Sequence, residues 1–318
     1  MITYKKKRSR ITAYKNALHC CRVSGNVYSQ GSVAHSGLAR DFGRWNSAGA
    51  FFIHAGIFFQ YNLSLYYLHK ILYNYPIMKT YKYETHLHTV QGSACGHTDG
   101  ADYIEAFYNI GYSGIFVTDH FFGGNTAVPK EGKWFDRVDQ YCSGYEAALA
   151  KAKQFNDEKG LTGTDDEFKV FFGIEQTFDG DDYLVYGLDK NWLYDHPEVE
   201  TMSHQELFDA VNREGGLMIQ AHPFRLRDYI RAVHIHPREI HGVEIYNAGN
   251  KAVENELAEH YATVYDFPMT SGSDIHNVDF IPPSEGKLNI GGMEFDTPIK
   301  DVYDYAERIK NKEGRILR

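Results

Sequence analysis

From Tyr81 onward, short apolar runs alternate with amphipathic stretches, a pattern typical of β-strands joined by α-helices. The strand-like runs are residues 81–86, 114–118, 169–175, 183–186, 217–220, 242–246 and 269–270. The helix-like stretches are residues 101–110, 145–159, 203–214, 251–264 and 299–310. Gly111 and Gly160 follow two of these stretches at the position where helices commonly end. About seven strands with helical crossovers predict an α/β fold that closes as a barrel over residues 78–318.

Residues 1–77 lack this alternation and differ in charge. They contain ten Lys or Arg residues and one acid, Asp41, whereas the rest of the chain contains 23 basic and 41 acidic residues. The apolar run 48–59 is shorter than the roughly 20 residues that a transmembrane helix needs. A transit-like presequence is an alternative. We expect a disordered or non-native basic extension, with Met78 as the true start.

The acidic charge of residues 78–318 argues against an extensive nucleic-acid surface, which needs clustered Lys and Arg. A small anionic substrate would instead need local positive charge, which metal ions can provide. The four cysteines form no CxxC pair, so we expect reduced thiols in a cytoplasmic protein. We expect no membrane partner, and the sequence leaves the oligomeric state open.

Side chains that can bind metal gather at the ends of the predicted strands. The first strand ends in His86-Leu87-His88, and the alternation of side chains along a strand directs both histidines to one face. The other strand ends carry Asp119, His120, Glu175, His222, Asp274 and His276. The carboxyl ends of the strands form the catalytic face of an α/β barrel. The sequence therefore predicts a metal site at this rim.

The motifs HxH, TDH, GIE, AHP and GSDxH, between residues 84 and 276, resemble those of the PHP (polymerase and histidinol phosphatase) family. The resemblance implies a distorted (β/α)7 barrel with two or three divalent metal ions. In this sequence it implies that the first ion is bound by His86, His88, Glu175 and Asp274. It also implies that Glu175 bridges to a second ion bound by His222, and that His120 and His276 bind a third.

The resemblance implies a metal-dependent phosphoesterase, and the ligand types fit that chemistry. Imidazole and carboxylate ligands suit Zn²⁺, Mn²⁺ or Fe²⁺. Such ions lower the pKa of a bound water and neutralise the charge of phosphoryl oxygens. The expected substrate is a small phosphorylated molecule, either a phosphomonoester such as histidinol phosphate or a nucleotide phosphodiester. No sequence feature selects between them.

Two family ligands have no clear counterpart in this sequence. The family often has a histidine near residues 186–189, where Asp189 is either an oxygen ligand or an ordinary loop residue. In the loop after His88, the candidates are Cys95, His97 and Asp99. We assign His97 to the third ion and Asp99 to the N-cap of the next helix, and we expect Cys95 to be packed.

Further residues are candidates for supporting roles. Arg225, three residues after His222, can bind a substrate phosphate with its guanidinium group, or it forms an outward salt bridge. Asp119 either orients a ligand histidine or caps the following segment. We interpret the remaining histidines of helical and loop segments as non-ligands: His204, His234, His236, His241 and His260.

Two other functions remain as alternatives. An amidohydrolase also begins with HxH on the first strand of a barrel, but it would need a bridging lysine after the fourth strand and further histidines after the fifth and sixth. A PHP-like binding or regulatory module without activity would have lost ligands, whereas this chain retains most of them.

Overall fold

The computed structural model describes residues 79–228, 230–281 and 290–318. The predicted extension, residues 1–77, lies outside the described residues, so its disorder and its dispensability stay predictions. Among the described residues, no helix is both long and apolar enough to cross a membrane.

All seven expected strands are present at nearly the expected positions, and two further strands follow near the C-terminus. The strands are β1 (Tyr81–Leu87), β2 (Gly114–Val117), β3 (Lys169–Phe178), β4 (Asp181–Tyr186), β5 (Leu217–Gln220), β6 (Gly242–Asn247), β7 (Met269–Gly272), β8 (Gly292–Phe295) and β9 (Arg315–Leu317). They form one sheet in the order β7-β6-β5-β4-β3-β2-β1-β8-β9.

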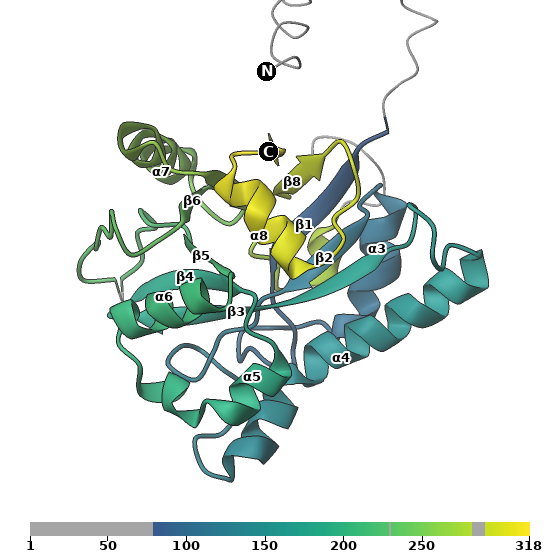
Figure 1. Ribbon diagram of the computed structural model, residues 1–318, viewed down its shortest axis with the longest axis horizontal. Helices are drawn as coiled ribbons and strands as arrows, with labels where there is room; N and C mark the ends of the chain where they lie inside the picture. Colours follow the sequence, from purple (N-terminus) through teal and green to yellow (C-terminus); the bar gives the residue numbers. More distant parts are fainter. Residues whose placement is uncertain (1–78, 229, 282–289) are drawn as a thin grey trace, which may run out of the picture. The chain divides into compact units, whose positions relative to one another are not determined.

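The α-helices are α3 (Tyr103–Asn109), α4 (Trp134–Lys159), α5 (Lys190–Asp195), α6 (His204–Arg213), α7 (Ala252–Tyr265) and α8 (Val302–Lys310). Three short 3-10 helices are η1 (Gly100–Asp102), η2 (Pro197–Thr201) and η3 (Val278–Phe280). The long α4, which crosses the lower part of Figure 1, begins at Trp134, well before the predicted 145. Gly144 lowers the helix propensity of this region, but a Cβ there would lie 2.1 Å from Thr89 Oγ1. Packing therefore requires a glycine inside this helix.

The β3–β4 pair departs from the predicted alternation of strands and helices. β4 runs antiparallel to both β3 and β5. β3 turns directly into β4 through Asp179 and Gly180, which both have positive φ, as a two-residue hairpin turn requires. The expected (β/α)7 count is therefore not confirmed, because one of the seven units is a hairpin without a helix.

The nine strands form a nearly closed, barrel-like sheet. β1 and β7 meet again beyond their ends, where His88 N donates to Ile275 O at 2.9 Å and Leu87 bridges to Ile275. β8 pairs antiparallel with the first residues of β1, Tyr81 to Tyr83. The distorted barrel expected from the sequence is thus present in outline, with β8 and β9 as additional strands.

The core has three parts. One apolar cluster packs α3 and α4 against β1, β2 and β3, and a second packs α4, α5, α6 and α7 against the strands from β3 to β6. The third lies on the opposite face of the strands, where α8 contributes Tyr305, Ala306 and Ile309. Figure 1 shows α8 in yellow, and its Tyr305 ring packs on Phe116 of β2 with a centroid distance of 4.5 Å. These layers hold the strand ends that carry the ligand-type side chains.

Candidate metal centre

The buried carboxylate of Glu175, on β3, lies at the centre of a group of histidines. Its Oε1 is 3.1 Å from His86 Nε2 and 3.2 Å from His222 Nε2. Its Oε2 is 3.3 Å from His88 Nε2 and 2.7 Å from His120 Nδ1. Each oxygen therefore faces two imidazoles, which is the arrangement expected of a carboxylate that bridges two cations.

Asp274 and His276 complete the group from the segment after β7. Asp274 Oδ1 lies 3.0 Å from His88 Nε2 and 3.5 Å from His86 Nε2. His88, His120 and His276 form a third set in which the ligand atoms lie within 4.8 Å of one another. The structure thus brings together seven of the eight predicted metal ligands. The exception is His97.

The arrangement of the donor atoms suits a bound cation better than it suits hydrogen bonds between these atoms. His86 Nε2, His88 Nε2, His120 Nδ1 and Glu175 Oε2 are all buried, and among the described residues none has a partner in hydrogen-bonding geometry, although these atoms lie at ion-pair distances from one another. Buried polar atoms are normally hydrogen-bonded. Convergent imidazole and carboxylate atoms without such bonds are the ligand set of a transition metal ion such as Zn²⁺.

Strong electrostatic coupling within the group agrees with this interpretation. Burial alone would raise the pKa of Glu175, but His120, His86 and His88 hold it well below its usual range. Burial alone would lower the pKa of His86, but the carboxylates of Glu244, Asp274 and Glu175 raise it well above its usual value. Burial and the neighbouring His120 lower the pKa of His88 to about 3, which favours the neutral ring that binds metal.

At two positions of the site the backbone adopts a conformation that is rare for non-glycine residues. His222 has φ of 29° and Asp274 has φ of 55°, and such positive values cost free energy in non-glycine residues. At Gly272, a Cβ atom would lie 2.5 Å from His86 Cβ and 2.7 Å from Glu244 Oε1. The GSDxH motif therefore needs its glycine to let β7 approach His86.

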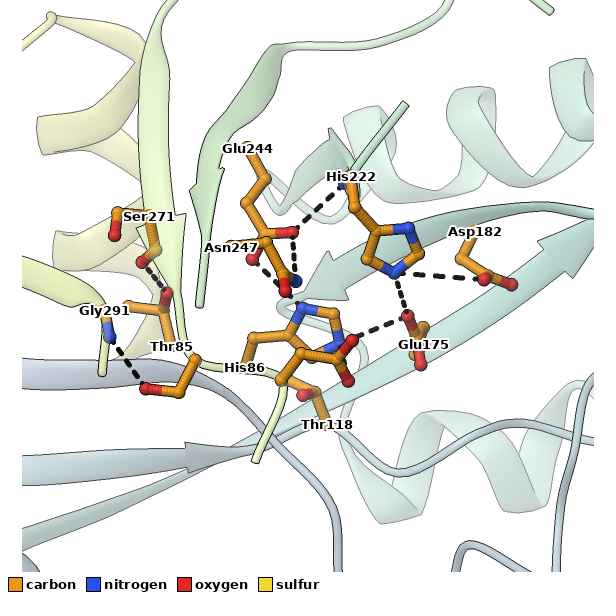
Figure 2. A network of polar contacts seen from close by, with 12 residues as sticks. Thr85, His86, Thr118, Glu175, Asp182, His222, Glu244, Asn247, Ser271 and Gly291 are labelled. Atoms are coloured by element: carbon orange, nitrogen blue, oxygen red, sulfur yellow. Dashed lines mark hydrogen bonds and ion pairs between the residues drawn. The ribbon is translucent and has the colours of Figure 1, made fainter. Parts of the chain in front are cut away.

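Glu244, on β6, is a supporting residue that the sequence analysis missed. Its Oε1 lies 3.0 Å from His86 Nδ1, and its Oε2 accepts hydrogen bonds from His222 N and Asn247 Nδ2. Figure 2 shows Glu244, His222 and Glu175 grouped around His86. A carboxylate on the outer ring nitrogen fixes the tautomer that leaves Nε2 free for a metal. The sequence feature that could have indicated this role is the glutamate in the otherwise apolar run GVEIY.

Asp119 positions His88 and is enclosed by neighbouring side chains. Its carboxylate accepts hydrogen bonds from Thr89 N, Thr89 Oγ1 and Ser93 Oγ at 2.6–2.7 Å. Ser93 Oγ in turn lies 3.0 Å from His88 Nδ1. Asp119 is almost fully buried, so its carboxylate supports the loop and, through Ser93, the ring of His88. The orienting role considered from the sequence is supported, for His88 and not for the adjacent His120.

The loop after His88 differs from the sequence assignment. The His97 side chain is exposed, and this residue belongs to none of the metal-type groups among the described residues. Cys95, expected to be packed, instead lines the pocket beside His120 and His276, and its interaction with these imidazoles outweighs burial and lowers the pKa of its thiol to about 6. Asp99 accepts a hydrogen bond from Ala101 N at the start of η1, so the predicted capping role is confirmed.

Asp189 is also not at the centre. It caps α5 by accepting a hydrogen bond from Trp192 N at 2.8 Å. The reason is the direction of β4: because this strand is antiparallel, its first residues and not its last lie at the ligand rim. Asp182, near the start of β4, lies there instead, with Oδ2 3.9 Å from His222 Nε2.

A pocket of about 500 Å³ opens over the histidine group. Its lining includes Cys95, His120, Asp182, Arg225, Asp274 and His276. Arg225 Nη2 lies 2.6 Å from Asp274 Oδ2 and donates to Asn247 Oδ1, while Nε donates to Asn250 Oδ1. The guanidinium group is therefore held at the pocket wall, and the outward salt bridge considered from the sequence is absent.

The comparisons of the sequence with known proteins give one partial match. No family model matches the sequence. An uncharacterised protein of Methanocaldococcus jannaschii is 37% identical over 79 residues, which cover 22% of this chain and 33% of that protein.

Solved structures are more informative about the fold. A two-domain protein from Bacteroides vulgatus, described as containing a predicted PHP-like metal-dependent phosphoesterase, matches with 15% identity and a TM-score of 0.51. The match covers 75% of this chain and 65% of that chain. An amidohydrolase from Chromobacterium violaceum matches with 14% identity and a TM-score of 0.37, over 74% of this chain and 97% of that chain. The chain thus spans less than two thirds of the M. jannaschii and B. vulgatus proteins, and the B. vulgatus match shows that it shares the fold of a PHP-like protein.

Proposed function

We propose that this protein is a metal-dependent hydrolase of phosphate esters. The observation that carries the proposal is the position of Glu175, whose two carboxylate oxygens face four buried imidazoles. Divalent ions bound there would lower the pKa of a water molecule and neutralise charge on the phosphoryl oxygens. The likeness in fold to a PHP-like protein is consistent with this chemistry.

The ligand sets follow from the three groups of donor atoms. His86, His88 and Asp274 would bind one ion, and His86, Glu175 and His222 are placed for a second. Both groups include His86, but its Nδ1 faces Glu244 and its Nε2 can bind only one ion. The carboxylates of Glu175 and Asp274 would therefore be the groups shared between the two ions. Asp182, close to His222, replaces Asp189 as the additional oxygen donor.

A third ion would be bound by His120 and His276, with Cys95 in place of His97. Cys95 lines the same pocket as both imidazoles, and its interaction with them lowers the pKa of its thiol. A thiolate ligand favours Zn²⁺ or Fe²⁺ over Mn²⁺. Of the three ion sites, the third would therefore discriminate most strongly between Zn²⁺ or Fe²⁺ and Mn²⁺.

Arg225 has the position of a phosphate-binding residue. Its guanidinium group is held by two asparagines and Asp274 at the pocket wall, so little side-chain entropy remains to be lost when an anion binds. We infer that its remaining donor capacity binds a phosphoryl oxygen. The size of the pocket suits a small phosphorylated molecule, either a monoester or a nucleotide diester.

One observation weighs against the amidohydrolase alternative. The bridging lysine that such an enzyme needs is not among the described residues that line the pocket. The carboxylate between the imidazoles is instead Glu175. A phosphate ester is thus the better match than an amide.

The experiment is a substrate screen of the full chain loaded with Zn²⁺, Mn²⁺ or Fe²⁺. Phosphomonoesters, nucleotide phosphodiesters and cyclic amides are offered in parallel. We expect release of phosphate or cleavage of a diester, abolished by a chelator and restored by added metal. Hydrolysis of the amides alone would favour the amidohydrolase alternative, and no hydrolysis with any metal would favour an inactive binding module.

A further inference from the structure

A second group of metal-type side chains lies away from the candidate metal centre. His204 is the first residue of α6, and His236 and Glu239 lie in the segment between β5 and β6. One ligand atom from each of the three lies within 4.8 Å of the others. In the sequence both histidines lie in helical or loop segments, which predicted non-ligands, and only the fold brings them together.

The distances match those of a small metal site. Glu239 Oε2 lies 3.2 Å from His204 Nδ1 and 3.6 Å from His236 Nδ1. Zinc–ligand bonds of about 2.0–2.2 Å in tetrahedral geometry place neighbouring donor atoms about 3.3–3.6 Å apart. The two imidazoles are stacked, with ring centroids 4.0 Å apart. A rotation of the partly exposed His236 ring about χ2, a torsion with broad preferences, would direct both nitrogens to one point.

The surroundings of His204 are unusual for a histidine with a packing role alone. Its Nε2 is buried and has no hydrogen-bond partner among the described residues, and the Tyr183 hydroxyl is in the same condition. The Tyr183 ring lies 4.5 Å from the His204 ring. A buried polar atom without a hydrogen-bond partner destabilises the fold. A cation bound to Nδ1 would stabilise the folded state and offset this destabilisation.

A metal ion at this site would have a structural role, because His236 and Glu239 lie in a long connection. Between β5 and β6 the described residues form no helix or strand, and connections of this length without secondary structure are uncommon. The same segment begins with His222 and Arg225, at the candidate metal centre. An ion that joins this segment to α6 would restrict its motion.

We propose that His204, His236 and Glu239 bind one divalent transition metal ion, of the Zn²⁺ class, which fastens the β5–β6 segment to α6. This site is separate from the candidate metal centre and does not depend on the proposed hydrolase activity.

The test is the zinc content of the full chain after equilibration with limiting free Zn²⁺ and removal of unbound metal. The His204→Ala, His236→Ala and Glu239→Gln variants should each bind about one ion fewer per chain than the wild type. The matched control is His260→Ala, on the exposed face of α7, which should bind the wild-type amount. In an Asp274→Asn background, which empties part of the candidate metal centre, the His236→Ala change should still remove one further ion.

The outcomes separate this site from the proposed function. Unchanged zinc content in both His236→Ala and Glu239→Gln would overturn the inference, even if the protein hydrolyses phosphate esters. Loss of one ion in these variants would support it, even if no hydrolysis is found. If His204→Ala fails to fold because its side chain is buried, the two partly exposed positions decide the result.

Discussion

His86 Nδ1 lies 3.0 Å from Glu244 Oε1, and both side chains are completely buried. His86 occupies two of the three ligand groups in the candidate metal centre. The carboxylate of Glu244 therefore fixes the orientation of the ring that offers its Nε2 to both groups, and this nitrogen can bind one ion.

Replacing Glu244 by glutamine tests this relationship. The amide oxygen can keep the hydrogen bonds from His222 N and Asn247, which leaves the amide NH₂ facing His86 Nδ1. That donor favours the tautomer with the proton on Nε2, which cannot bind metal there. We expect metal affinity to fall by about 10- to 100-fold, measured by competition with a chelating dye.

Glu254→Gln is the matched control. Glu254 is also buried, and it accepts hydrogen bonds from Leu226 N and Lys251 N without contacting a ligand histidine. Its variant should retain the metal affinity of the wild type. Equal losses in both variants would mean that Glu244 acts through general stability.

Arg225→Ala should weaken phosphate binding. We expect kcat/KM on the active substrate to fall by about 10- to 100-fold, because a charge-assisted hydrogen bond contributes roughly 1.5–3 kcal/mol. Metal content should stay near that of the wild type, since the metal-facing oxygen of Asp274 is Oδ1. Arg227→Ala, which removes an exposed guanidinium group paired with Glu254, should leave kcat/KM unchanged. Identical kinetics in both variants would make Arg225 a structural residue.

The loop after β1 offers a direct comparison of two candidate ligands. Cys95→Ser should remove the sulfur-to-metal charge-transfer absorption of the Co²⁺-loaded protein and lower metal content by about one ion per chain. His97→Ala should change neither, because its side chain is exposed and outside the ligand groups. Loss of an ion in His97→Ala alone would restore the assignment made from the sequence.

His241 predicts a pH dependence of stability. Burial, with a smaller contribution from Lys310, lowers its pKa from 6.5 to about 4 in the folded protein. Between these values the unfolded chain binds a proton that the folded chain does not, so stability falls as pH decreases from about 6.5 to 4. His241 Nδ1 accepts from Met218 N and Nε2 contacts Asn212 Oδ1, a pair of roles that glutamine can take over.

His241→Gln should therefore lose less stability than the wild type in this range, and the two proteins should differ least in pH dependence above pH 7. Urea unfolding at several pH values measures the difference. Parallel curves for the two proteins would show that His241 does not titrate as the structure implies.

The strand-end ligands could be predicted from the sequence because parallel strands bring their carboxyl ends to one rim, whatever the details of the loops. This holds for His86, His88, Glu175 and His222, which lie where the pattern placed them. The direction of β4 could not be obtained from its apolar run alone. The dipeptide Asp179-Gly180 is typical of a hairpin turn. A hairpin there predicts an antiparallel β4, and Asp182 in place of Asp189 at the ligand rim.

Loop residues and supporting residues were less predictable. Hydrogen bonds from Thr89 and Ser93 to Asp119 fix the conformation of residues 89–99. The sequence does not show these bonds, so Cys95, although nearer to the family ligand in spacing, was expected to be packed, and His97 was preferred. Glu244 lies within an apolar strand, where its role depends on which face points inward. The second histidine group joins segments separated by about thirty residues, and only the fold shows that they meet.

The most direct test of the proposed metal-dependent phosphoesterase is the Glu175→Gln variant, measured for metal content and for phosphate-ester hydrolysis in the same preparation. Glu175 is the carboxylate whose two oxygens face four imidazoles, so a neutral amide should leave the ions without a shared counter-charge. We predict loss of at least one ion per chain and loss of hydrolysis, with the fold retained by circular dichroism. Wild-type metal content together with most of the wild-type activity would contradict the account.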